Sequence, residues 1–241
     1  SVDTETSSLN PLEADLVGIS FSYAANKACY IPLAHKNVKG LKKELVLRKI
    51  KKVLEDASIK KVGQNIKFDF LIFKKNGIEL NPIEDTMLIS YTLDAGVNRH
   101  NLDILSEIHL NHKTITYKEL VGSGKNKLSF PDIDLNKATE YAGEDADVTL
   151  RLYHDLKKRL DQEKLNKIYE SFEKPMIRLL SKLEFNGIKV DNLYLKKLSK
   201  NFEKKLNKIE KEIYVIAGKE FNIASPKQLG EIIYNKLKIA K

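Results

Sequence analysis

The sequence predicts an α/β domain at residues 1–165, followed by a smaller all-helical domain at residues 166–241. Three observations support this prediction. Near the N-terminus, apolar residues alternate with small or polar ones, which is typical of strands. In the middle of the chain, apolar residues recur at intervals of three and four, which is typical of amphipathic helices. After residue 165 only the helical interval remains, whereas strands mixed with helices before that point indicate the α/β class.

Strands are expected in the first 64 residues. Residues 16–23 alternate apolar with small or polar side chains, and residues 28–33 form a second apolar run. The turn residues Asn26-Lys27 between them suggest a hairpin. Residues 1–4 would form the first strand and residues 60–64 a short one. Because the sequence opens inside an expected strand and has no initiator Met, we expect a piece of a longer protein.

Helices are expected over residues 41–54, 66–76 and 134–160, where apolar side chains gather on one face of a helical projection. Several short helices are expected between residues 82 and 120. Residues 122–125 (GSGK) predict a flexible basic loop before the long third helix.

The last 76 residues carry three helical patterns. The first is an apolar stripe of Met176, Leu179, Leu180 and Leu183 that ends at Asn186-Gly187. Asp191 can cap the second, and Ser225 before Pro226 begins the third. The second pattern is a heptad-like seam formed by Leu195, Leu198, Phe202, Leu206, Ile209, Ile213 and Ile216.

The composition excludes several classes of protein. Hydrophobic residues make up 42% of the chain, which argues against a disordered protein, and no apolar run approaches the ~18 residues of a membrane span. The single Cys29 excludes an internal disulfide framework and a multi-cysteine zinc site.

The net charge of +9 is unevenly distributed along the chain: residues 1–165 hold 25 basic and 24 acidic side chains, and residues 166–241 hold 17 basic and 9 acidic ones. A basic block is typical of polyanion binding, although a solvated face of a lysine-rich helix explains it equally well.

Acidic residues supply the candidates for chemistry. Asp3 and Glu5 lie two positions apart in an expected strand, so both point to one face, as ligands of a divalent cation would. An exposed strand end is the alternative, because the acidic-x-acidic pattern occurs six times in the chain. Asp69 follows a short strand in the first turns of a helix, where the helix dipole alone would favour an acid. Tyr141 and Asp145 share a helix face, which also fits a half-buried Tyr beside a solvated acid.

Taken together, these segments resemble the three motifs of the proofreading 3′–5′ exonuclease domain of the family A, Klenow-type DNA polymerases, the DNA polymerase I family. The segments are Asp3-Thr4-Glu5-Thr6, Gly63-Gln64-Asn65 with Asp69, and Tyr141-Ala142-Gly143-Glu144-Asp145. The resemblance extends over essentially the whole chain. It includes residues 112–116, 122–127 and 141–150, and, in the last part, residues 187–191, 218–222 and 225–229, which are similar to the start of a polymerase domain.

The resemblance implies a ribonuclease H-like domain with a mixed central sheet, followed by an incomplete, all-α thumb. It also implies two divalent metal ions, Mg²⁺ with Mn²⁺ or Zn²⁺ as substitutes. Asp3, Glu5 and Asp145 would hold the first ion. Asp3 would bridge to the second, and Asp69 would support that ion largely through water. Tyr141 and Glu5 would orient the attacking water.

Substrate contacts follow from the same comparison. Leu9 would wedge against the terminal base, with an ordinary core leucine as the alternative. Tyr117 would stack on the unpaired strand, and Gln64 and Asn65 would contact the terminal nucleotide. Phe68 departs from the Tyr of some relatives, which puts a minor polar contact in doubt.

The implied activity is hydrolysis of the 3′-terminal phosphodiester of single-stranded or frayed DNA. The parent protein would be a monomeric DNA-directed DNA polymerase of replication and repair, with its basic helical tail on duplex backbone, no membrane association and no polymerase activity in this part alone. It would reside in the bacterial cytoplasm near the nucleoid, or in an organelle. Two alternatives remain open: a catalytically silent DNA-binding scaffold, and an RNA exonuclease of the ribonuclease D type.

Overall fold

The computed structural model describes residues 1–36, 38, 41–124 and 127–239. Residue 125 of the predicted basic loop therefore lies outside the described residues. The chain divides into two compact units, Ser1–Gly187 and Ile188–Lys241.

The strands of the first unit form two ladders. The first is antiparallel, in the order β1-β2-β3, and consists of Val2–Thr6 (β1), Leu16–Ala24 (β2) and Lys27–Pro32 (β3). The second is a parallel pair of Lys61–Gly63 (β4) and Ile83–Asp85 (β5). The predicted hairpin is confirmed as β2 and β3, and Asn26 in its turn takes a left-handed conformation that Asn tolerates better than most residues. Cys29 is exposed on β3.

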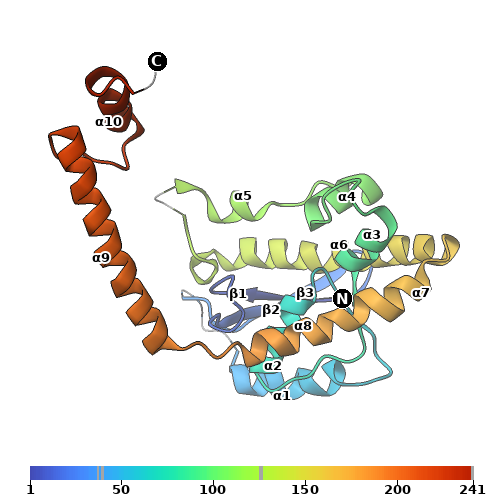
Figure 1. Ribbon diagram of the computed structural model, residues 1–241. Coiled ribbons are helices and arrows are strands. Elements are labelled where there is room, and N and C mark those ends of the chain that lie inside the picture. Colours follow the sequence, from blue (N-terminus) through green and yellow to red (C-terminus); the bar gives the residue numbers. More distant parts are fainter. Residues whose placement is uncertain (37, 39–40, 125–126, 240–241) are drawn as a thin grey trace. The chain divides into compact units, whose positions relative to one another are not determined.

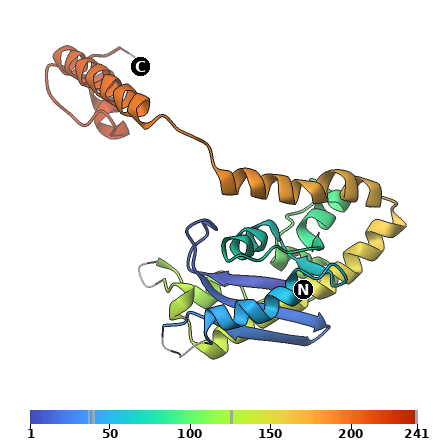
Figure 2. The same ribbon diagram turned by 90° about the horizontal axis from the view of Figure 1, so that it is seen from below.

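The helices of this unit enclose the antiparallel ladder. Helix α6 covers one face of β1–β3, and α1 and α2 lie on the other face (Figure 1). Figure 2 shows the unit from below, with α1 in front of the strands. The three long predicted helices are confirmed to within two residues at each end. In chain order the helices are Lys43–Leu54 (α1), Lys67–Lys75 (α2), Thr86–Asp94 (α3), Leu102–Leu110 (α4), Tyr117–Val121 (α5) and Leu135–Gln162 (α6), with a 3₁₀ turn at Phe130–Asp132.

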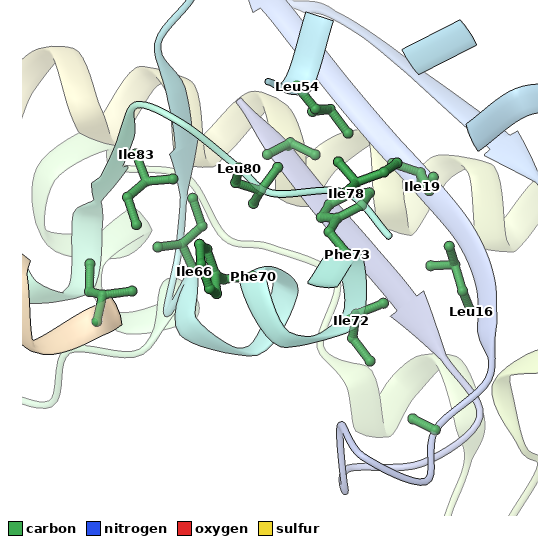
Figure 3. Close-up of a cluster of buried hydrophobic side chains, with 13 residues drawn as sticks. Leu16, Ile19, Leu54, Ile66, Phe70, Ile72, Phe73, Ile78, Leu80 and Ile83 are labelled. Carbon is green, nitrogen blue, oxygen red and sulfur yellow. The ribbon is translucent and has the colours of Figure 1, made fainter. Parts of the chain in front are cut away.

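Buried apolar clusters hold these layers together. In the first, Leu16 and Ile19 of β2 pack with Leu54 of α1 and Phe73 of α2, all of them almost completely buried (Figure 3). Each such side chain contributes about 1.5–3 kcal/mol through its removal from water. The second cluster lies along α6, where Val148, Leu152, Leu156 and Leu160 repeat every four residues and so share one face of the helix.

Residues 166–187 belong to the first compact unit, although the predicted domain boundary follows residue 165. Tyr169 is fully buried in the cluster along α6, and Ile177 is buried in the cluster around α2. The unit ends where Gly187, with φ of 66°, terminates the last helix. These residues form Asn166–Ile168 (α7), a π-helical stretch Tyr169–Glu173 and Lys174–Asn186 (α8).

The apolar stripe expected on α8 is not the buried face of that helix. Its four members are between 38 and 58% exposed, whereas Ile177 and Ser181 are buried. Ile177 and Ser181 are one turn apart, and the Ser181 hydroxyl donates to the Ile177 carbonyl. A small residue that satisfies its own hydroxyl within the helix allows close packing, and a purely apolar pattern does not reveal it.

The second unit is helical, as expected. It contains Asn192–Ala217 (α9), Pro226–Gly230 (α10) and a π-helical stretch Glu231–Lys236. Both predicted caps are confirmed: the Asp191 carboxylate accepts from Tyr194 N, and the Ser225 hydroxyl accepts from Gln228 N. The heptad-like seam of α9 remains largely exposed, with Phe202 and Leu206 at 60 and 64%. Across both units, the described residues include no helix with the length and apolarity that crossing a membrane requires.

Candidate active site

Asp3 and Glu5 lie on β1 with one residue between them. The pairing with β2 places Asp3 opposite Ser20 and Glu5 opposite Gly18. Because side chains alternate along a strand, the two carboxylates point to the same face of the ladder. Glu5 is buried and Asp3 is half-buried. The observed strand extends to Thr6, beyond the predicted end at Thr4, so both acids are part of regular structure.

Asp69 reaches the same region from α2. It lies in the first turn of that helix, directly after the loop that follows β4, and is only 2% exposed. Thr4 Oγ1 donates a hydrogen bond of 2.5 Å to Asp69 Oδ1, which ties the helix to the middle of β1. This contact gives the buried carboxylate a side-chain hydrogen-bond partner.

Asp145 and Tyr141 come from α6, one helical turn apart. Asp3, Glu5 and Asp145 each offer a carboxylate oxygen, and the three oxygens lie within 4.8 Å of one another. Asp69 is not part of that group, but it lines the same cleft. The structure thus brings together acids from three distant segments, as the motif comparison predicted.

Burial raises the pKa of all four carboxyl groups, and repulsion by neighbouring acids adds to this effect at Glu5, Asp69 and Asp145. Burial is the largest cause for Asp3, whose pKa rises to about 6 despite an opposing backbone hydrogen bond at Thr4. For Glu5, burial and then the charges of Asp3, Asp145 and Asp69 raise the pKa well above its ordinary value. Burial followed by the Asp3 charge does the same for Asp69 and Asp145. Such a cluster is electrostatically unfavourable until a cation neutralises it.

The donor set fits a hard divalent cation. Carboxylate oxygens are the ligands that Mg²⁺ and Mn²⁺ prefer. Within the described part of the chain, Glu5 Oε1 is buried and has no hydrogen-bond partner, so a ligand-binding atom remains available. Asp3, Glu5 and Asp145 are therefore the residues that could hold a metal ion.

A cleft of about 700 Å³ opens beside the carboxylates. Leu9, on the loop after β1, lines it and is 90% exposed, which excludes the alternative of a core leucine. Tyr117, the first residue of α5, also lines it and meets the Tyr141 ring edge-on, with centroids 6.3 Å apart. The Tyr141 ring also packs against Phe130 at 6.3 Å. The cleft therefore combines an acidic floor with exposed apolar and aromatic side chains.

Gln64 and Asn65 occupy the loop between β4 and α2 and also line the cleft. Gln64 Nε2 donates to His100 O at 2.8 Å, and its Oε1 accepts from Thr86 Oγ1 at 2.5 Å. Asn65 takes a left-handed conformation with φ of 56°, and its backbone N–H donates to the Asp85 carboxylate. The Gln64 amide thus holds the loop in place, a structural role that the sequence did not indicate.

Lys127 is a further residue of the cleft that was not predicted from the sequence. Among the residues that the structure describes, Lys127 is the one cation lining the cleft, and its Nζ lies 5.7 Å from the centroid of the Tyr117 ring. The available signal was its place in the segment 122–127, which the motif comparison had already matched. A lysine ammonium group can form charge-assisted hydrogen bonds with an anionic ligand such as a phosphate.

Comparison with known proteins agrees with this geometry. Residues 1–161 match the family model described as 3′–5′ exonuclease. The chain belongs to the 3′–5′ exonuclease family. Residues 192–241 match the model described as DNA polymerase family A. The order of the two matches confirms the resemblance inferred from the motifs. The exonuclease family implies the use of divalent metal ions, for which this chain has the carboxylate cluster.

Individual relatives extend the comparison. The DNA polymerase I of Rhizobium leguminosarum is 45% identical over 255 residues, which cover 98% of this chain and 25% of that protein. The DNA polymerase I of Pseudomonas aeruginosa is 40% identical, over 98% of this chain and 26% of that protein. This exonuclease-family chain therefore spans about a quarter of the length of these curated relatives.

Solved structures show the same fold at lower identity. The POL domain of Pol1 from M. smegmatis, in complex with DNA primer-template and dNTP, has a TM-score of 0.73 at 22% identity, over 100% of this chain and 37% of that one. Brucella melitensis NrnC has a TM-score of 0.61 at 24% identity, over 77% of this chain and 84% of that one. At these identities the similarity concerns the fold alone. It agrees with the predicted ribonuclease H-like exonuclease domain.

Proposed function

We propose that the chain is a 3′–5′ exodeoxyribonuclease that removes nucleotides from single-stranded or frayed 3′ ends with two divalent metal ions. The observation that carries the proposal is the group of Asp3, Glu5 and Asp145, whose carboxylate oxygens lie within 4.8 Å of one another beside the cleft. Buried acids that repel one another cost stability, so their concentration at one cleft favours a functional role over a structural one.

In this proposal Asp3, Glu5 and Asp145 would hold one cation, and Asp3 and Asp69 would hold the other. Mg²⁺ is the expected ion, with Mn²⁺ or Zn²⁺ as substitutes. When bound, the cations supply charge compensation for the phosphodiester and a lower pKa for the attacking water. Glu5 and Tyr141 orient that water; burial raises the pKa of the Tyr141 phenol further above neutrality, so its hydroxyl is protonated and can donate a hydrogen bond.

The remaining cleft residues bind and orient the DNA. Tyr117 stacks on an unpaired base, and Leu9 wedges against the terminal base. Gln64 and Asn65 contact the terminal nucleotide, and the Lys127 ammonium group meets a phosphate. Stacking tolerates any base, so an end is selected because it is unpaired rather than because of its sequence.

We assign the basic residues of the last part of the chain to duplex DNA backbone. Residues 166–241 carry 17 basic and 9 acidic side chains, and the match to DNA polymerase family A falls in this part. The names of the curated relatives support a parent DNA-directed DNA polymerase, to which we assign a role in replication and repair.

A second candidate is an exonuclease for RNA or short oligonucleotides. The observation in its favour is the structural likeness to Brucella melitensis NrnC bound to pGG, with a TM-score of 0.61 at 23% identity. The match of residues 192–241 to DNA polymerase family A favours DNA.

The test follows a 5′-labelled single-stranded DNA and an RNA of the same sequence, each incubated with Mg²⁺ or Mn²⁺. We expect stepwise shortening of the DNA from its 3′ end. Asp3→Ala should reduce the rate by at least ~10³-fold, because loss of a bridging ligand removes several kcal/mol of transition-state stabilisation. Asp15→Ala, a change of the same type at an exposed position, should have no effect. An inactive wild type, full activity in Asp3→Ala or a preference for RNA would overturn the proposal.

A further inference from the structure

Residues 111–116, here called the strap, connect α4 to α5 without regular secondary structure. Figure 1 shows α4 and α5 alongside α6, with the strap between them. The strap contains the segment 112–116 (HKTIT), which the motif comparison matched but to which the proposed chemistry assigns no role. Irregular segments hold one conformation only where side chains or neighbouring backbone satisfy their polar groups.

Helix α4 anchors the strap at two points. The Ser106 hydroxyl donates to the His112 carbonyl at 2.8 Å, and the Thr114 hydroxyl donates to Asp103 Oδ1 at 2.7 Å. Ser106 and Thr114 are buried, so these hydrogen bonds are shielded from competing water.

Helix α6 supplies the third anchor through Glu144. Its Oε1 lies 2.8 Å from His112 Nε2, and its Oε2 accepts from Ile115 N at 2.6 Å. Both oxygens of one carboxylate are therefore committed to the strap. Glu144 directly precedes Asp145, but successive residues of a helix point about 100° apart, and Glu144 is not among the residues that line the cleft.

The strap ends at Tyr117, the aromatic residue of the cleft. Thr116 caps the N-terminus of α5 in a capping box with Glu119, so the strap sets where that five-residue helix begins. Tyr117 is the first residue of the helix and lies edge-on to Tyr141, which is on α6 one turn before Asp145. Glu144 thus links the helix that carries Asp145 to the segment that carries Tyr117.

We propose that Glu144 is a positioning residue, which holds the strap so that Tyr117 presents its ring to the unpaired DNA strand. This inference rests on the proposed function. Tyr117 is 41% exposed at the start of a short helix, and ordering such a side chain during binding costs affinity. Because the strap is already fixed to α6 through His112 and Ile115, this ordering takes place during folding and does not reduce the affinity for DNA.

The absence of tryptophan from the chain gives a direct readout, because Tyr117→Trp creates a protein with one tryptophan at the stacking position. In this background, quenching of the tryptophan by oligo(dT) in EDTA reports stacking without any turnover. The Mg²⁺-dependent rate on the same oligonucleotide in the Tyr117 protein gives KM and kcat separately. If the wild type is inactive, the proposed function fails, but the quenching still tests the role of Glu144.

The variants are Glu144→Ala, Glu144→Gln and His112→Ala, with Glu140→Ala as the matched control because Glu140 is an exposed acid one turn earlier on α6. Glu144→Ala should weaken oligonucleotide binding and raise KM about 5-fold or more, up to the ~150-fold that complete loss of one stacked base allows, with kcat within about twofold. His112→Ala should also weaken oligonucleotide binding and raise KM, because it removes the same contact by a change in the strap. Unlike Glu144→Ala, it does not alter a neighbour of Asp145. The KM of Glu144→Gln should lie between those of the wild type and Glu144→Ala, since the amide oxygen of Gln can still accept from Ile115 N.

Three results would overturn the assignment. One is a fall in kcat or in Mn²⁺ affinity with KM unchanged, which would mean that Glu144 acts through Asp145. Another is a Glu144→Ala protein that binds DNA like Glu140→Ala. The third applies if Glu144→Ala fails to fold: wild-type quenching in both His112→Ala and Glu144→Gln would then refute the role of the strap.

Discussion

Asp3→Asn is expected to stabilise the metal-free protein at neutral pH while removing the proposed nuclease activity. Burial raises the Asp3 pKa from 3.8 to about 6, so the folded state holds the proton more tightly than the unfolded state does. The stabilisation from this group is complete below pH 3.8 and is lost as the pH rises through about 6. At 1.36 kcal/mol per pKa unit, the loss amounts to about 3 kcal/mol at pH 7.5, an upper limit because Asp3 is half-buried.

Differential scanning calorimetry in EDTA would measure this difference. A gain of up to about 3 kcal/mol corresponds to an increase in Tm of up to about 10 °C for a unit of this size. Asp3→Asn should therefore melt above the wild type at pH 7.5, and the two should converge as the pH falls towards 4. Adding Mg²⁺ should raise the wild-type Tm and leave that of Asp3→Asn nearly unchanged.

Asp15→Asn makes the same chemical change at an exposed position and should follow the wild type in every condition. The electrostatic reasoning fails if Asp3→Asn melts at or below the wild type in EDTA at pH 7.5. It also fails if the gap between the two proteins does not narrow in acid.

Three further changes test other parts of the structure. Lys127→Ala should lower the slope of log KM against log salt concentration by about 0.7, as expected for one lost contact to single-stranded phosphate. Lys118→Ala, at an exposed position, should leave the slope unchanged, and the same slope in Lys127→Ala and the wild type would exclude the contact. Ile177→Ala should lower the free energy of unfolding of the first unit by about 2–5 kcal/mol. Leu179→Ala, on the exposed side of α8, should lower it by less than about 1 kcal/mol, and equal losses would contradict the packing of α8 on α2. Leu9→Ala should raise KM about tenfold without changing Tm, because Leu9 is 90% exposed in the free protein and would be covered only by DNA; a lower Tm would contradict this view.

Much of the fold could be predicted because its signals are local. A single side chain marks each of the caps at Asp191 and Ser225, and the four-residue repeat from Val148 to Leu160 marks the inner face of α6. The end of the first unit could not be predicted in this way. It depends on the burial of Tyr169 in the cluster along α6, which also contains Val62 and Ile89, and of Ile177 in the cluster around α2; contacts between segments so far apart in the chain leave no periodic signal near residue 166.

The candidate site likewise combines features that the sequence predicted with features that depend on contacts between distant residues. None of Asp3, Asp69 and Asp145 could be distinguished from an ordinary surface acid by its own surroundings in the sequence, and only the joint match of three motifs placed them in one site. Glu144 carries no local signal, since its contact is with a strap about 30 residues earlier. The Gln64 amide was expected at the substrate, yet it also holds its own loop through Thr86 and His100.

Cys29 gives a practical consequence of the sheet arrangement. It is the single cysteine of the chain, and it is exposed on β3 at the end of the strand order β1-β2-β3, two strands from the carboxylates of β1. A maleimide dye would attach at one known point of the β1-β2-β3 ladder without any engineered thiol. With a second dye on the DNA, energy transfer could then follow how long a 3′ end remains at the nuclease unit, one molecule at a time.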